Sequence, residues 1–245
     1  MGNERTKLLS EWTFDCKKSC PKKDYLKSRQ KLCQIGFLSR EITNYELRIT
    51  NWIDKPKFEA SHHPYIPRNQ RRLPMQTKKV VVLPYDPKWA SDFQQIRDEI
   101  EEAVGHLILR VEHVGSTSVA GMSAKPCIDL DVVIADASRL PAVISGLEAI
   151  GYIHEGDLGI KGREAFKYTN KPHLQNHHLY VCPRDSEELH RHLTVRDDLK
   201  SHPEAVAAYS RVKETAARLY PDSIDGYMAY KSPCIEELYA LCGLK

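Results

Sequence analysis

Residues 111–134, VEHVGSTSVAGMSAKPCIDLDVVI, combine strand patterns, a turn of small residues and two carboxylates within one short stretch. Residues 111–114 alternate apolar and polar side chains, and residues 115–118, GSTS, interrupt that alternation. Residues 127–134 then form an apolar run that only two aspartates interrupt. The pattern predicts a strand, a loop with a helical turn, and a second strand.

The two aspartates of the second strand, Asp129 and Asp131, are the first candidates for a functional site. Alternate side chains of a strand share a face, so their Cβ atoms are expected about 7 Å apart on the same side. Mg²⁺ typically takes one or two protein carboxylates and completes its shell with water and phosphate oxygens. Gly115 admits a close approach of phosphate to backbone N–H groups, and Ser116 adds a hydroxyl. These residues predict a site for a metal-bound polyphosphate, although a solvated Asp pair and a plain turn also fit the pattern.

The spacing of these residues resembles the signature of the nucleotidyltransferase superfamily, in which a Gly-Ser pair precedes an Asp-x-Asp strand. Gly115-Ser116 is followed, after twelve residues, by Asp129-Leu130-Asp131. The chain from roughly residue 80 to residue 242 further resembles the GrpB-like family in four segments, which are HVGSTSVAGMSAKPCIDLDVVI (113–134), GIKGREAF (159–166), HHLYV (177–181) and HLTVRDDLKSHPEAVAAYSRVK (192–213).

The resemblance implies an α/β (α+β) fold, with a small mixed sheet, flanking helices and a helical C-terminal region. It also implies Mg²⁺-dependent transfer of a nucleotidyl group from a nucleoside triphosphate to an unknown acceptor, with pyrophosphate leaving. Asp129 and Asp131 would hold the metal. The residues expected to bind the nucleotide are Gly115, Ser116, Thr117, Lys125 and Arg163.

One part of the nucleotidyltransferase pattern is missing, because a third carboxylate normally stands on a later strand. The matching strand, HHLYV at 177–181, has no acid. His178 as a general base, or Glu164 from the neighbouring strand, are the candidates for that role. A non-catalytic nucleotide- or phosphate-binding module and a toxin-like modifier of RNA or protein remain alternatives. A carboxylate, histidine or other base within about 5 Å of the Asp pair would favour an enzyme.

The composition is that of a globular protein, with 245 residues of which 41% are hydrophobic. No run of about 18 apolar residues and no signal-peptide pattern occurs, so we expect a cytoplasmic protein with no membrane segment. Seven scattered cysteines suit reduced thiols. A zinc site remains a weaker alternative, because half of the usual ligand spacing is absent; its candidate ligands are Cys16, Cys20, Cys33, His62 and His63.

Charge divides the chain into two unlike parts. Residues 1–79 hold 18 Lys and Arg against 8 Asp and Glu, a net charge of +10, which leaves 18 against 25, or −7, for the remainder. We therefore predict a basic helical unit at 1–55, a proline-rich basic linker at 56–79, and the GrpB-like domain at 80–245. The basic N-terminal unit is a candidate for nucleic-acid contact.

Periodicity and breaker residues predict the elements of the main domain. We expect strands at 80–83, 111–114, 127–134 and 177–181 and a glycine-rich hairpin around 156–167. Helices are expected at 87–104, 137–150, 186–200, 203–219 and 224–244, the last one interrupted by Pro233. P-loop, Gly-x-Ser-x-Gly and His-Glu-x-x-His motifs are absent from the sequence, which removes the enzyme classes that those motifs mark.

Overall fold

The computed structural model describes residues 79–244. The predicted helical unit, nearly all of the predicted linker, and the candidate zinc ligands lie outside the described residues. The described elements are α4 (Lys88–Val104), η1 (Gly105–Leu107), β1 (Arg110–Val114), η2 (Ser116–Ser118), β2 (Ile128–Ile134), η3 (Ala137–Arg139), α5 (Leu140–Ala149), β3 (Tyr152–Gly156), β4 (Glu164–Tyr168), β5 (His177–Pro183), α6 (Glu187–Ser201), α7 (Pro203–Leu219) and α8 (Ile224–Leu241).

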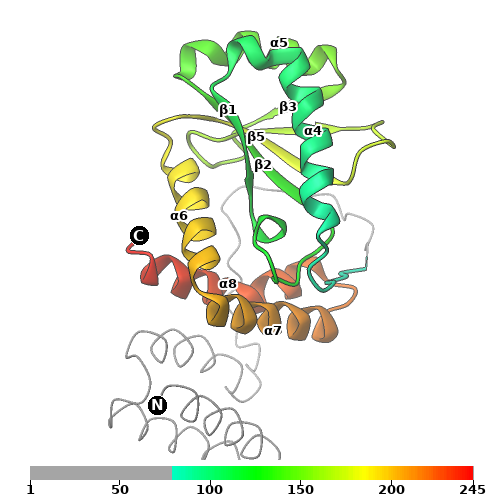
Figure 1. Cartoon of the computed structure of the whole chain (residues 1–245), viewed down its shortest axis with the longest axis vertical. Helices are drawn as coiled ribbons and strands as arrows, with labels where there is room; N and C mark the ends of the chain where they lie inside the picture. Colours follow the sequence, from blue (N-terminus) through cyan, green and yellow to red (C-terminus); the bar gives the residue numbers. More distant parts are fainter. Residues whose placement is uncertain (1–78, 245) are drawn as a thin grey trace, which may run out of the picture. The chain divides into compact units, whose positions relative to one another are not determined.

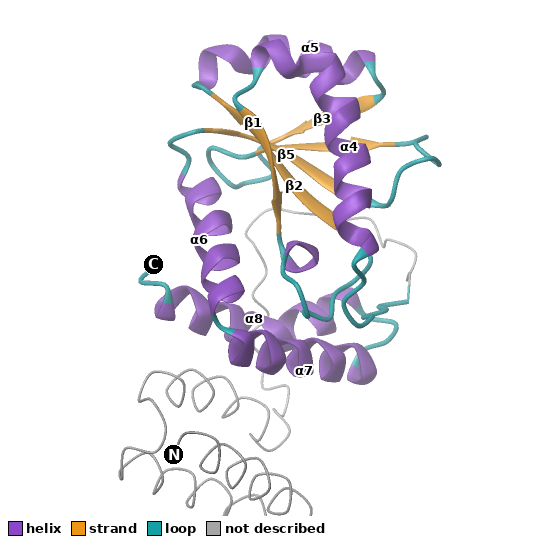
Figure 2. Ribbon diagram, in the orientation of Figure 1, coloured by secondary structure: helices purple, strands orange, loops and turns teal. Residues whose placement is uncertain are grey.

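A five-stranded mixed sheet with the order β1-β2-β5-β4-β3 organises these elements (Figure 1). Only β2 and β5 pair in parallel, and the other neighbours are antiparallel. Helices flank the sheet, and α6, α7 and α8 form a helical C-terminal region (Figure 2). The predicted α/β fold with a mixed sheet and helical C-terminal region is confirmed.

One face of the sheet carries the main hydrophobic core, under α4 and α5. The apolar stripe of α4 places Trp89, Ile96 and Ile100 against alternate residues of β2, because a period of 3.6 puts these residues on one side of the helix. From β2 the residues that face this core include Leu130 and Val132. The intervening residues of β2, the two aspartates among them, must therefore point to the opposite face.

The opposite face of the sheet is partly covered by α6. Val133 and Cys182 pack there against Leu189 at the start of α6. Beyond the sheet, α7 and α8 pack on each other and on the segment just before α4, where Val80 is buried and its N–H donates to Pro221 O at 2.7 Å. This arrangement leaves β2 and β5 with a polar face between α6 and the α7–α8 pair.

Two predicted elements differ from the structure. The expected strand at 80–83 is reduced to one antiparallel bridge between Leu83 and Ala124, because no neighbouring strand of the described residues offers further pairing. The expected break at Pro233 is absent, since α8 continues through it. Proline removes a single backbone donor, and the neighbouring turns of an 18-residue helix keep their own hydrogen bonds.

Candidate functional site

Asp129 and Asp131 lie on the face of β2 that points away from the main core. In the register of the sheet, Val114 of β1 and His178 of β5 flank Asp129, while Glu112 and Tyr180 flank Asp131. Side chains directly opposite one another on paired strands share a face. The spacing of two residues therefore puts both carboxylates on the same face of the sheet. Together with Glu112 they form a row of acidic side chains, here called the carboxylate row.

The Gly-Ser turn contacts the first of these carboxylates. Gly115 has φ +68°, and a Cβ atom built there would stand 2.4 Å from Asp129 Oδ2. Only glycine fits, because the left-handed backbone and the close approach both exclude a side chain. The turn from β1 into η2 thus brings Ser116 beside the carboxylate row, whereas the Thr117 hydroxyl is buried and lies 3.0 Å from His113 Nε2.

Asp129 is hydrogen-bonded to a histidine on the neighbouring strand. His178 Nδ1 lies 2.8 Å from Asp129 Oδ1. This hydrogen bond is the largest cause that raises the pKa of His178 to about 10. At neutral pH the imidazole is therefore protonated, and its Nδ1–H donates a hydrogen bond to the carboxylate.

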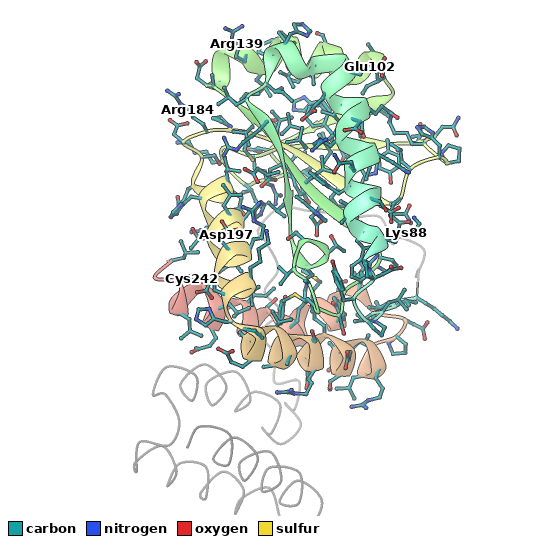
Figure 3. The ribbon with its side chains drawn as sticks, in the orientation of Figure 1. Lys88, Glu102, Arg139, Arg184, Asp197 and Cys242 are labelled. Carbon is teal, nitrogen blue, oxygen red and sulfur yellow. The ribbon has the colours of Figure 1, made fainter. Side chains whose placement is uncertain are left out.

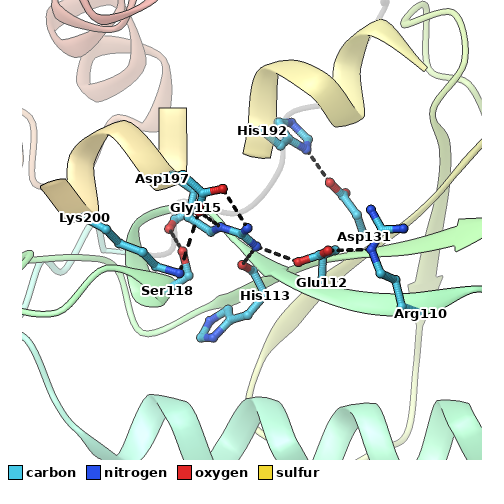
Figure 4. A network of polar contacts seen from close by, with 10 residues as sticks. Arg110, Glu112, His113, Gly115, Ser118, Asp131, His192, Asp197 and Lys200 are labelled. Atoms are coloured by element: carbon cyan, nitrogen blue, oxygen red, sulfur yellow. Dashed lines mark hydrogen bonds and ion pairs between the residues drawn. The ribbon is translucent and has the colours of Figure 1, made fainter. Parts of the chain in front are cut away.

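Asp131 is fully buried and is hydrogen-bonded to a histidine from α6 (Figure 4). His192 Nδ1 lies 2.7 Å from Asp131 Oδ2. Burial lowers the pKa of His192, but the hydrogen bonds to Asp131 and Glu188 outweigh it and bring that pKa up to about 9. Burial also raises the pKa of Asp131. The second carboxylate oxygen, Asp131 Oδ1, is buried without any hydrogen-bond partner, and such atoms are rare in proteins.

Three cations near the carboxylate row form no ion pair with any described residue: Lys213 of α7, Lys231 of α8 and Arg163. Lys213 Nζ donates to Ser116 Oγ at 3.0 Å and stands 4.5 Å from the centre of the Tyr209 ring. Burial lowers the pKa of Lys213 to about 7 and that of Lys231 to about 8. Lys213 is buried and Lys231 is half-buried. A lysine that is removed from water without a carboxylate in contact is costly, which makes this region a candidate site for an anion.

Sequence reasoning missed Lys213, Lys231 and His192, which are contributed by the three C-terminal helices. The charges of Asp129 and Lys125 both act on Lys231, so the predicted residue Lys125 belongs to the same electrostatic neighbourhood. No local pattern marks these side chains, because each comes from a helix far along the chain from β2. The one sequence signal for two of them is the family-like segment 192–213, which begins at His192 and ends at Lys213 but does not say that these side chains reach β2.

The prediction that Glu164 stands beside the two aspartates is wrong, because its side chain lies on the other face of the sheet. Glu164 pairs with Val181 in the sheet, whose side chain belongs to the main core, so Glu164 lies on the face opposite the aspartates. Its carboxylate instead bonds to His154 Nε2 at 2.7 Å. A shift of one residue in a strand reverses the face, and the hairpin before β4 sets that register.

A further carboxylate, Glu112 of β1, stands opposite Asp131 in the register. It accepts from Arg110 Nε at 2.6 Å and from Arg196 Nη1 at 2.7 Å. Burial raises the pKa of Glu112, but the two arginines outweigh it and hold that pKa below its usual value. Figure 4 shows Glu112 beside Arg110, and with both arginines bound Glu112 is an ionised group already neutralised by the fold.

Within the carboxylate row, Asp129 and Asp131 each have an oxygen left for a metal, whereas both oxygens of Glu112 accept hydrogen bonds from arginines. Within residues 79–244, no group of three or more His, Cys, Asp and Glu side chains has the geometry of a metal site. A cation here would therefore depend on Asp129, on the unpartnered Asp131 Oδ1 and on oxygens from a ligand or water. That donor set suits Mg²⁺, which binds few protein ligands and keeps phosphate and water oxygens.

Comparison with known proteins relates this chain to one family. The family model described as "GrpB protein" matches residues 79–241. The UPF0157 protein YqkA of Bacillus subtilis (strain 168) is 32% identical over 160 residues, which are 65% of this chain and 46% of that protein. The chain thus spans about half the length of YqkA.

A solved structure from the same family also matches this chain. The crystal structure of the conserved protein GrpB from Enterococcus faecalis matches 66% of this chain and 96% of that chain, with a TM-score of 0.59 and 31% sequence identity. The structure of the GLD-2/RNP-8 complex matches with a TM-score of 0.45 at 13% identity, over 82% of this chain and 65% of that chain.

Among the described helices, none is long and apolar enough to span a membrane.

Proposed function

The chain belongs to the GrpB family, and we propose that it is a Mg²⁺-dependent nucleotidyltransferase that moves a nucleotidyl group from a nucleoside triphosphate to an acceptor. One observation carries the proposal: Asp131 Oδ1 is buried and unpartnered on the same strand face as Asp129, and three nearby cations, Lys213, Lys231 and Arg163, form no ion pair with any described residue. An uncompensated acceptor atom suits a cation, and uncompensated lysines suit an anion. A metal-bound triphosphate supplies both.

The residues of the chain divide the triphosphate task between them. Asp129 and Asp131 would hold Mg²⁺, which when bound neutralises phosphate charge and stabilises the attacking and leaving oxygens. Ser116 and Lys213, which already share a hydrogen bond, would bind phosphate oxygens, and Lys231 would add a second positive charge. Phosphate beside these lysines favours their charged forms, so binding would restore the protons that burial removes.

The acceptor proton is the least defined part of the reaction. His178 and His192 both lie within hydrogen-bond distance of the aspartates, which satisfies the expected presence of a base near the pair. Both imidazoles, however, have raised pKa values and hold protons at neutral pH. This observation favours the second candidate function, a non-catalytic module that binds nucleotide without transferring it.

Thermal melting of the full chain with Mg²⁺ and each of the four ribonucleoside triphosphates tests the binding step. We expect one or more triphosphates to raise the melting temperature by roughly 5 °C at about a hundredfold excess over Kd. Asp129→Asn and Asp131→Asn should each lose this ligand-induced rise. Glu164→Gln, the same chemical change on the opposite face of the sheet, should keep it.

The baseline of the two Asn variants must be measured without ligand. Repulsion between two carboxylates alone would make Asp→Asn neutral or stabilising, but each aspartate is hydrogen-bonded to a protonated histidine. We therefore expect both variants to melt lower than wild type, with Asp131→Asn the lower of the two because Asp131 is fully buried. The ligand response is therefore the difference between the melting temperatures of the same variant with and without ligand.

Release of pyrophosphate separates the two candidate functions. A nucleotidyltransferase should release pyrophosphate from the bound triphosphate when an acceptor-containing cell extract is added, and Asp131→Asn should not. A wild-type protein that shows a triphosphate-induced shift but no pyrophosphate release would support the binding module. No shift with any triphosphate would reject both functions.

A further inference from the structure

Arg163 is held in place without a charge partner. Its guanidinium lies over the ring of Tyr180, with Cζ 4.2 Å from the ring centre, and its Nε is buried without a hydrogen bond. Other arginines near the site are paired, since Arg191 contacts Glu187 and Arg196 contacts Glu112. An arginine whose planar fork is fixed but unpaired is arranged to bind an oxyanion in two-point fashion.

The backbone around Arg163 is fixed by the start of α6. Gly162, with φ +78°, accepts a hydrogen bond at its carbonyl from the Ser186 hydroxyl at 2.7 Å. The Arg163 N–H donates to Ile160 O at 3.2 Å. Because Ser186 also caps α6, the loop, the helix and the guanidinium are held as one unit, and little side-chain entropy remains to be lost on binding.

Arg163 and the two lysines act on different ends of the carboxylate row. Arg163 lies over Tyr180, whereas Lys213 donates to Ser116 Oγ, next to Gly115, whose backbone closely approaches Asp129. Tyr180, under the guanidinium, stands opposite Asp131 in the sheet. The site therefore has two separate positive regions, one beside each aspartate.

We propose that Arg163, stacked on Tyr180, binds a phosphate ester of the acceptor, so that the acceptor is a phosphorylated molecule whose reacting hydroxyl lies near Asp131. This inference rests on the proposed function, in which the triphosphate occupies the Lys213–Lys231 end. It assigns Arg163 to the acceptor rather than to the triphosphate. Asp131, whose Oδ1 has no partner, would then bind the metal of the triphosphate, and the Arg163 guanidinium would bind the phosphate of the acceptor.

Inorganic phosphate is the probe that tests the anion site without knowledge of the acceptor. Thermal melts of the full chain in phosphate are compared with melts in acetate and in chloride at equal ionic strength, without Mg²⁺ or nucleotide. Arg163→Met should lose at least half of the phosphate-induced shift, and Arg163→Lys, which keeps the charge but not the planar fork, should lose part of it. Arg184→Met, an exposed arginine labelled in Figure 3, is the matched control and should keep the full shift.

Stability without ligand decides whether Arg163 is a structural residue. Arg163→Met removes the buried, unpaired Nε but also the stacking of the guanidinium on Tyr180, so we expect its melting temperature in chloride to stay close to that of wild type. A lower melting temperature would mean that the guanidinium is already satisfied by the fold, and it would overturn the proposal. A full phosphate shift in Arg163→Met, or an equal shift from acetate, would also overturn it.

A last arm separates the acceptor site from the triphosphate site. Phosphate at Arg163 and Mg²⁺-triphosphate should bind together, so their thermal shifts should add in wild type, and Lys213→Met should lose only the triphosphate part. Competition between the two ligands that Arg163→Met abolishes would place Arg163 in the triphosphate site and overturn the assignment. If no triphosphate binds while the phosphate shift still depends on Arg163, the proposed function fails and the anion site stands.

Discussion

Single residues of the carboxylate row show how the fold tolerates charge that has no permanent counter-ion. Each aspartate of β2 accepts a hydrogen bond from a protonated histidine, Asp129 from His178 and Asp131 from His192, while Asp131 keeps one oxygen unpartnered. Lys213 solves the same problem differently, because burial favours its neutral form. A ligand that carries a cation and an anion together would relieve both costs.

Lys213→Met is expected to stabilise the unliganded protein and to remove its response to Mg²⁺-triphosphate. The folded-state pKa of Lys213 is about 7 against an ordinary 10.5, so between these values the unfolded chain binds the proton and the folded chain does not. This lysine therefore costs stability in full below pH 7, and the cost disappears as the pH rises through 10.5. Each unit of the shift corresponds to about 1.4 kcal/mol.

Melting of wild type and Lys213→Met from pH 6 to pH 10 measures this cost. The variant should melt higher at pH 7, and the difference should narrow toward pH 10. The titratable groups around Lys213 are Lys231, Glu214, Asp129 and Cys234, whose buried thiol stays neutral in this pH range. Lys231→Met in the same series controls for the second lysine. A difference that does not change with pH would show that Lys213 is charged in the fold.

Gly115→Ala is expected to be more harmful than alanine at another left-handed glycine. Gly121 has φ +79° with open space around it, whereas a Cβ at Gly115 would stand 2.4 Å from Asp129 Oδ2. Both variants pay the backbone strain, and only the first displaces the carboxylate, at a further cost of about 1–3 kcal/mol. Chemical denaturation measures the difference, and Gly115→Ala alone should lose the triphosphate response. Equal stabilities would show that the turn yields without moving Asp129.

At the scale of elements, α6 joins the edge strand β1 to the site. Arg196 of α6 donates to Glu112 Oε2 at 2.7 Å and to His113 O at 3.1 Å, and His192, one turn earlier, contacts Asp131. Residues at i and i+4 lie on the same side of a helix, so one face of α6 makes both contacts. Figure 4 shows these contacts between the helix and the two strands. The position of His192 in the site therefore depends on the docking of α6 on β1.

Arg196→Met is expected to lower the free energy of unfolding by about 2–3 kcal/mol, because the partly buried Glu112 then keeps only Arg110 as a partner. Arg97→Met is the matched control, since Arg97 pairs with exposed carboxylates on α4 and should cost less than about 1 kcal/mol. Urea denaturation of both variants measures the two costs. If the costs are equal, α6 is held by its apolar contacts alone.

At the scale of the whole molecule, the described body from residue 79 to residue 244 contains the sheet, its helices and every residue of the site. The family model matches this same body, at residues 79–241. The excess of positive charge, by contrast, belongs to residues 1–79. All residues of the candidate site named above lie in this body, and contact of the basic segment with nucleic acid is a separate proposal.

Removal of residues 1–76 is expected to leave a protein that unfolds in one cooperative transition and keeps its response to Mg²⁺-triphosphate. The main core is built from α4, α5 and the sheet, all of which follow residue 79. Differential scanning calorimetry of the shortened and full chains measures the transition. A shortened chain that melts without cooperativity would show that the N-terminal residues complete the core.

The sequence alone determined the local directions of side chains in this protein, and the tertiary structure decided which distant groups meet. Period-two alternation placed Asp129 and Asp131 on one face of β2, and the Gly-Ser turn marked the left-handed residue before η2. The face of Glu164 was beyond sequence reasoning, because one residue of register in a hairpin reverses it.

The groups that complete the site, Lys213, Lys231 and His192, come from three helices whose packing alone brings them to β2. Periodicity reports how a side chain points relative to its own helix or strand. It carries no information on which other element will approach it, because that depends on the packing of apolar faces across the whole chain.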